Sequence, residues 1–170
     1  APTSTHFTLR NNGNVNASGG SYVAYLFGHD TSSDGMIQCG GYTGGSGNTE
    51  INLGFEPQFL MIKRTDTSED WLVLDTIRGL IVSGDDVSAN AQKDIFWNSS
   101  ASEATPTYAG VSPQANGFKV RSGLDGLYSS NGGTYIYMAI RKAPMATPTS
   151  RSSVFAIDTR GDAEPAFNSG

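Results

Sequence analysis

The chain has 170 residues, enough for one domain with a hydrophobic core, and only 16% of these residues are charged. Its net charge is −5 and its cations are scattered, which excludes the basic stripe that a nucleic-acid-binding protein needs. No apolar run approaches the ~18 residues of a membrane span, and the 21 glycines lack a collagen period, so they indicate turns between many short strands.

Apolar runs of strand length predict most of the secondary structure. In chain order these runs cover residues 22–27, 58–64, 70–75, 117–121 and 134–140. The second and third runs are joined by a short polar segment, which predicts a β-hairpin. Apolar and charged side chains alternate in the fourth run, as in a strand with one buried face. The last run is the richest in β-branched and aromatic residues.

The remaining segments carry weaker signals. Residues 85–93 begin with acidic side chains, which suits one or two turns of helix. Residues 98–113 and 143–153 are predicted to be a long loop and an extended connector. The glycine-rich residues 40–47 are predicted to form a wide hairpin turn, because they lack the Gly-Lys ending of a phosphate-binding loop. We therefore expect an all-β fold over 1–170, a single antiparallel β-sandwich of jelly-roll type with little helix.

Two parts of the chain resemble each other. Residues 7–10 (Phe-Thr-Leu-Arg) resemble residues 118–121 (Phe-Lys-Val-Arg). Residues 19–23 (Gly-Gly-Ser-Tyr-Val) resemble residues 132–136 (Gly-Gly-Thr-Tyr-Ile). In each copy the two segments flank a stretch rich in Gly, Ser and Asn, so two similar β-hairpins are predicted, at 7–27 and 118–140. Weaker matches follow each copy, ending at 52–54 and at 168–170. The alternatives are chance similarity between glycine-rich strands and a longer array of β modules, of which this chain is one unit.

No pattern in the sequence indicates catalysis. The only histidines are His6 and His29, and no Gly-x-Ser-x-Gly elbow presents a nucleophile. His29 is followed by Asp30, but adjacent side chains on a strand point to opposite faces. Paired acids that cleave glycosides need a separation of roughly 5 to 9 Å, and nothing marks one pair above another. We expect no enzymatic activity and no cofactor. A single free cysteine, Cys39, fits assembly in a reducing cytoplasm.

Carboxylates on predicted loops are candidate ligands for Ca²⁺, which prefers clustered oxygen atoms. These candidates are Asp66, Glu69, Asp70, Asp85 and Asp86. None of them belongs to an EF-hand loop, and the alternative for all five is solvated loop charge.

Loop aromatics are candidates for binding sugars, because sugar rings stack on exposed aromatic side chains and amides bond their hydroxyl groups. The candidate glycan-binding residues are Trp97, Asn98, Tyr108, Tyr128 and Asn131. The alternative for Trp97 and Tyr128 is that they close the hydrophobic core, as we expect of Trp71.

Several segments, in order along the chain, resemble a tail-fibre-like β domain in structural proteins of marine tailed phages. They are residues 14–19, 40–45, 51–64, 70–76, 116–119 and 133–139. In that family a Tyr-Thr-Gly-Asn-Gly turn precedes a Leu-Gly-Phe-x-Pro segment and an apolar strand ending in Lys-Arg. Here Gly45 replaces the Asn, and glycine also accepts the backbone angles of such a turn.

The resemblance implies a β-sandwich on the surface of a bacteriophage virion, in a tail fibre or similar appendage that is assembled in the host cytoplasm. It offers no catalytic residues to carry over. The expected partners are other copies of the chain, as a homotrimer by analogy with phage fibres, other virion proteins and a host surface polysaccharide. Two alternatives stay open: a capsid decoration protein, and a carbohydrate-binding module or glycan-cleaving domain outside a virion.

Overall fold

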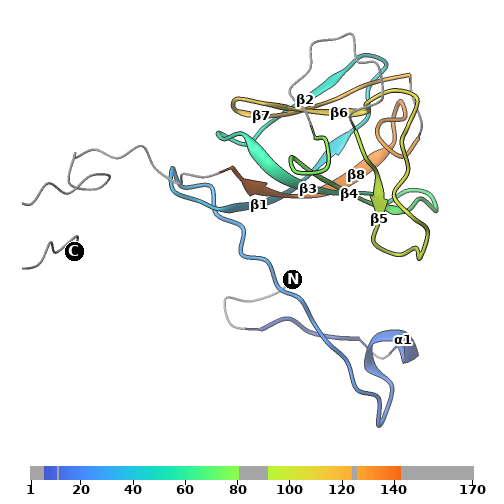
Figure 1. Ribbon diagram of the computed structural model, residues 1–170. Helices are drawn as coiled ribbons and strands as arrows, with labels where there is room; N and C mark the ends of the chain where they lie inside the picture. The colour runs from blue at the N-terminus through green and yellow to red at the C-terminus, as the bar shows by residue number, and fades with distance from the viewer. Residues whose placement is uncertain (1–5, 11, 81–91, 124–125, 143–170) are drawn as a thin grey trace, which may run out of the picture.

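The structure, a computed structural model, describes residues 6–10, 12–80, 92–123 and 126–142. These residues form eight strands and one helical turn, α1 (Gly13–Asn16). The strands make two antiparallel sheets that lie one above the other (Figure 1). The predicted all-β sandwich with little helix is confirmed. The helix found in this part of the chain is far too short to cross a membrane.

The two sheets differ in size. The large sheet has the order β1 (Ile37–Thr43), β8 (Thr134–Arg141), β3 (Pro57–Arg64), β4 (Trp71–Asp75) and β5 (Ile95–Phe96). The small sheet has the order β2 (Thr49–Asn52), β7 (Gly117–Val120) and β6 (Val111–Gln114). The predicted hairpin between the second and third apolar runs is confirmed, because β3 and β4 pair from Phe59↔Asp75 to Lys63↔Trp71.

The hydrophobic core lies between the two sheets. At its centre Phe118 is fully buried and meets the rings of Tyr42 and Tyr137 edge to face, with ring centroids 6.4 and 5.2 Å apart. Tyr42 also stacks on Tyr135 at 4.7 Å. Large aromatic side chains bury much apolar area and favour such geometries, so this group holds the small sheet on the large one.

The hairpin predicted at 7–27 is wrong. Neither residues 7–10 nor residues 22–27 form a strand, and α1 lies between them. Residues 6–10 and 12–30, here called the arm, leave the sandwich as an extended chain below the large sheet (Figure 1). The physical reason is the lack of a ladder partner: none of residues 21–28 makes a backbone–backbone hydrogen bond within the described part of the chain.

The hairpin predicted at 118–140 is also wrong, although its two strands exist. β7 pairs with β2 and β6 in the small sheet, whereas β8 pairs with β1 and β3 in the large sheet. Their apolar faces meet across the core, which brings Phe118 against Tyr137 and stabilises the two strands in opposite layers. The similar sequences at 7–27 and 118–140 therefore adopt different structures. The weaker matches beyond residue 142 lie outside the described residues.

Strands β1, β2, β5 and β6 were not predicted. β1 includes Gly40, which was assigned to a turn, but Gly40 lies under the ring of Tyr137: a Cβ there would be 2.7 Å from the phenol carbon Cζ. β6 begins inside the segment 98–113, which was predicted to be a loop, and ends one residue beyond it. The predicted helix falls almost wholly outside the described residues, and its last two residues, Gln92 and Lys93, are not helical. The connector at 143–153 lies outside them too.

The large sheet is apolar on both of its faces. On the face turned away from the small sheet, here called the outer face, Met61, Val73 and Met138 are buried. Around them pack Ile37, Cys39, Phe59, Trp71, Ile95 and Ile140. Antiparallel sheets commonly have one face on the core and the other in solvent, so an apolar outer face indicates that something covers it.

Candidate functional site

Two hollows of similar size lie on either side of β5. The first, here called the wedge, has a volume of about 450 Å³ and lies between the arm and the outer face. It is lined by Tyr25, Phe27, Met61, Trp71, Trp97 and Asn98. The second, here called the tyrosine cavity, has a volume of about 490 Å³. It is lined by Asp94, Phe96, Ala104, Pro106, Thr107, Tyr108, Gly123, Leu127 and Tyr128.

Hydrogen bonds tie the turn that follows β5 to the start of β4, next to the wedge. The amide N–H of Trp97 donates to the main-chain oxygen of Trp71 at 2.9 Å. The Asn98 side chain accepts from the Trp71 N–H at 2.9 Å and donates to the Asp70 carboxylate at 2.8 Å. Trp97 lies in this turn with 58% of its surface exposed. Since the amide of Asn98 already has partners, the wedge presents mainly apolar and aromatic surface.

The tyrosine cavity has a buried polar wall. Gln92, Asp94 and Tyr128 are at most 3% exposed. The Tyr128 hydroxyl donates to one oxygen of Asp94, and the Gln92 amide donates to the other at 2.7 Å. The Gln92 oxygen accepts from the Val111 N–H at 3.2 Å. Each partner fixes the next, so the Asp94 carboxylate is held in one orientation beside the cavity.

Tyr108 lies at the rim of this cavity. It is 54% exposed and comes from the loop that follows the backbone bridge between Asp94 and Ala104. Thr107 and Gly123 belong to the same lining. An exposed aromatic ring next to groups that bond hydroxyls is the combination that sugar recognition requires.

The five predicted glycan-binding residues do not form one site. Trp97 and Asn98 line the wedge, whereas Tyr108 and Tyr128 line the tyrosine cavity. Asn131 is exposed in the turn that precedes β8 and lines neither hollow. Tyr128, at 3% exposed, belongs to the core, and Trp97 does not. Trp71, which we expected in the core of the sandwich, is half-buried on the outer face.

Gln92 and Asp94 were not predicted from the sequence to belong to a site. Together with Phe96 they alternate along the chain, and this spacing places all three on one face of an extended segment. The alternation is a signal that could have been read, but the partners of these side chains come from β6 and from Tyr128, far along the chain. Tyr25 and Phe27 were predicted as strand residues rather than as lining of a site.

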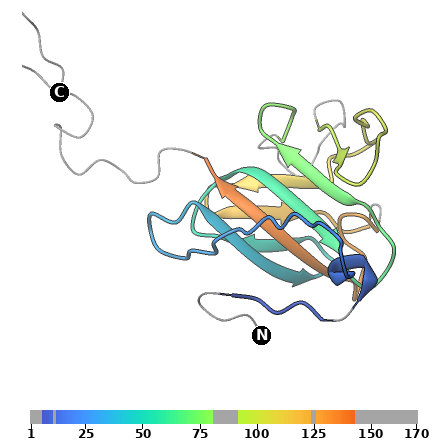
Figure 2. The ribbon, with the colours of Figure 1, turned by 90° about the horizontal axis from the view of Figure 1, so that it is seen from below.

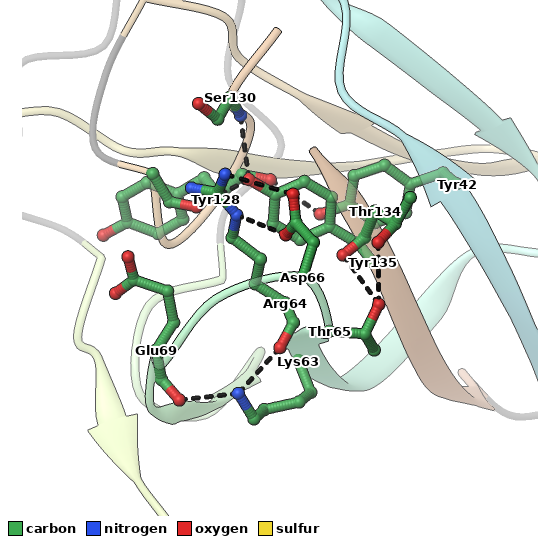
Figure 3. Close-up of polar contacts among 11 residues, drawn as sticks. Tyr42, Lys63, Arg64, Thr65, Asp66, Glu69, Tyr128, Ser130, Thr134 and Tyr135 are labelled. Carbon is green, nitrogen blue, oxygen red and sulfur yellow. Dashed lines mark hydrogen bonds and ion pairs between the residues drawn. The ribbon is translucent and has the colours of Figure 1, made fainter. Parts of the chain in front are cut away.

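The loop between β3 and β4 holds a separate polar network (Figure 3). The Arg64 guanidinium lies 5.8 Å from the centre of the Tyr135 ring and pairs with Asp66 at 2.7 Å. The hydrogen bond from Arg64 holds the pKa of Asp66 below its ordinary value. Lys63 donates to the main-chain oxygens of Arg64 and Glu69, at 2.7 Å each. These contacts shape the loop.

The candidate calcium ligands Asp66, Glu69 and Asp70 do not gather into one site. Arg64 holds Asp66 and Asn98 holds Asp70, so the carboxylates have partners on different elements. Among the described residues, no group of three or more His, Cys, Asp or Glu side chains gathers to hold a metal. The other two candidates, Asp85 and Asp86, lie outside those residues.

His29 and Asp30 fasten the root of the arm to β1. The His29 Nδ1 atom accepts from the Cys39 N–H at 3.0 Å, and the Asp30 N–H donates to the Ile37 oxygen at 2.9 Å. The Asp30 carboxylate accepts from the Ser32 N–H at 2.9 Å, and this bond lowers its pKa. The two side chains are therefore engaged separately and do not pair with each other.

Comparison with known proteins places the chain in a family. The model of a family described as "Domain of unknown function (DUF7483)" matches residues 1–144, which include the arm and the whole described sandwich. No curated protein and no solved structure matches the chain significantly.

Proposed function

We propose that this chain, which belongs to the family described as "Domain of unknown function (DUF7483)", is a non-catalytic structural and adhesion module of a bacteriophage virion appendage, such as a tail fibre. The resemblance of six of its segments to phage structural proteins supports the virion location. On this proposal the partners are other copies of the chain, other virion proteins and a polysaccharide on the host surface.

The observation that carries the adhesion role is the tyrosine cavity. Tyr108 presents an exposed ring at its rim, and the buried Asp94 carboxylate is held beside it by Tyr128 and Gln92. Carboxylate and hydroxyl oxygens are groups that sugar recognition uses, so this wall gives the cavity a polar character beside the exposed ring. Prearranged polar groups bind with little loss of conformational freedom.

The test is binding of the full chain to a panel of purified bacterial surface polysaccharides, immobilised for surface plasmon resonance. Tyr108→Ala should weaken binding to the recognised polysaccharide by about tenfold, which corresponds to roughly 1.4 kcal/mol. Trp97→Ala is the matched control, because Trp97 is an equally exposed aromatic on the other side of β5. It should leave glycan binding unchanged.

Three outcomes would contradict the proposal. Binding to none of the polysaccharides removes the adhesion role, and an equal loss in the two variants removes the tyrosine cavity as its site. Release of soluble sugar from a bound polysaccharide, abolished by replacing one carboxylate, would show that the chain is an enzyme instead.

A further inference from the structure

The lining of the tyrosine cavity carries charge of one sign. Asp94 belongs to this lining, and no Lys, Arg or His of the described residues does. Tyr128 and Gln92 bond the Asp94 carboxylate through uncharged groups. Lys93, the neighbour of Asp94 in the sequence, instead donates its ammonium to the Thr105 hydroxyl at 2.5 Å. A ligand in the cavity therefore meets a carboxylate and no cation of the described lining.

Most of the remaining lining is apolar. It includes Phe96, Ala104, Pro106 and Leu127, with the ring of Tyr108 at the rim. Charges interact more strongly beside such surfaces than in water, because the local dielectric is lower. A carboxylate brought in by a ligand would lose its water and face a charge of the same sign. An uncharged sugar ring avoids both costs and can pack its C–H groups on the apolar side chains.

The loop that carries Tyr128 is fastened from several sides. The Tyr128 ring packs on Gly110 so closely that a Cβ at Gly110 would overlap it. The main-chain oxygen of Tyr128 accepts from the Tyr42 hydroxyl at 2.6 Å (Figure 3). The Tyr135 hydroxyl, on a ring that stacks on Tyr42, donates to the Gly126 oxygen at 2.6 Å. A charged ligand could not displace this wall of the cavity without breaking these bonds.

The cavity lies where a polymer can reach it. β5, which separates the cavity from the wedge, is the last strand of the large sheet. Figure 2, in which β5 is yellow-green, shows this strand and the loop that follows it at one edge of the sandwich. The volume of about 490 Å³ is typical of sites for small molecules. An edge position suits a single sugar residue whose neighbours in the polymer continue into solvent.

We propose that the tyrosine cavity selects uncharged sugar residues and excludes those that carry a carboxylate, such as uronic acids. This inference rests on the proposed adhesion role and names the class of polysaccharide that the site recognises. The exclusion arises at Asp94 and not from the net charge of −5 on the whole chain. The two origins differ in their response to salt, because exposed charges are screened by ions and buried charges much less.

Three forms of one polysaccharide test the selection. The first is a panel member with primary hydroxyl groups that the full chain binds. Oxidation of those hydroxyls gives carboxylates, and amidation of the carboxylates gives an uncharged form of similar size. In surface plasmon resonance at 1 M NaCl, where the screening length is about 3 Å, the wild-type chain should bind the oxidised form at least tenfold more weakly than the amidated form. Equal affinity for the two forms would overturn the selection and leave the adhesion role standing.

A pair of variants locates the origin of the selection. Asp94→Asn removes the charge and keeps the shape of the side chain, so it should lower the tenfold ratio to less than threefold. Glu103→Gln is the matched control, because it removes the same charge from an exposed residue outside the lining. It should keep the wild-type ratio.

Circular dichroism shows whether each variant is folded, and the wild-type ratio decides the question if Asp94→Asn is not. A folded Asp94→Asn chain with the wild-type ratio, or a Glu103→Gln chain that loses the ratio as well, would contradict the assignment to Asp94. Failure of the wild-type chain to bind any polysaccharide is a different result, because it removes the adhesion role itself and the selection with it.

Discussion

Strand β8 and the arm carry apolar runs of similar length, but the run in β8 is largely buried whereas the run in the arm is largely exposed. In β8, Tyr135, Met138 and Ala139 are at most 4% exposed, and the strand pairs with a neighbour on each side. In the arm, Val23 is 80% exposed and Tyr25 is 78% exposed. The difference shows that an apolar run becomes a strand only where the fold provides a ladder and a cover.

The energetic consequence is that the two runs have different roles in a single chain. Full burial of one large apolar side chain stabilises a protein by about 1.5–3 kcal/mol, so β8 contributes strongly to folding. The exposed run at 22–27 contributes little, because most of its side-chain surface stays in contact with solvent. Stability should therefore reside in the sandwich.

The largest effect should come from removing the centre of the core. Phe118→Ala leaves a cavity between Tyr42 and Tyr137 and should lower the free energy of unfolding by about 3–5 kcal/mol. Tyr25→Ala, in the arm, should change it by no more than about 0.5 kcal/mol in dilute solution. Urea denaturation of both variants measures the contrast. A comparable loss for Tyr25→Ala would mean that the arm is part of the folded core.

A smaller loss should follow from a change in the small sheet. Gly117 pairs with Asn52, and a Cβ at Gly117 would overlap the main-chain oxygen of Ile51. Gly117→Ala should therefore push β7 from β2 and cost about 1–3 kcal/mol by thermal or urea denaturation. Gly47→Ala is the control, because a Cβ at Gly47 would have no heavy atom within 4 Å. Equal stability of the two variants would contradict the β2–β7 pairing.

The smallest effect concerns alkaline pH. Burial raises the pKa of the Tyr42 phenol above its ordinary value of 10.0. The unfolded chain then loses this proton from about pH 10 while the folded chain keeps it, so stability is full below that pH and falls above it, by up to about 1.4 kcal/mol per pH unit. Tyr42→Phe should reduce this slope in urea denaturation at alkaline pH. An unchanged slope would mean that Tyr42 ionises in the folded state.

The sequence predicted the strands that carry continuous apolar runs within the sandwich, at β3, β4, β7 and β8. It missed β1 because glycine usually weakens a strand, whereas Gly40 makes room for Tyr137, a residue 97 positions away in the chain. It placed a strand at 22–27 because local pattern cannot show whether a partner strand exists. Both errors arise from contacts between distant parts of the chain.

Only single residues of the two hollows could be predicted from the sequence, because contacts between distant parts of the chain bring the lining together. Exposed aromatics on loops were found correctly for Trp97 and Tyr108. Which residues share a hollow depends on the fold: β5 separates the two aromatics, and the arm brings Tyr25 to the wedge. The buried partners of Asp94 come from separate segments and leave no local motif.

Amide hydrogen exchange of the full chain tests most directly whether the stability resides in the sandwich and not in the arm. We expect the amides of β3 and β8 to be strongly protected, because each strand pairs with a neighbour on both sides. Those of residues 21–28 should exchange rapidly, because they make no backbone–backbone hydrogen bonds to other described residues. Protection of residues 21–28 comparable to that of β3 and β8 would contradict the account.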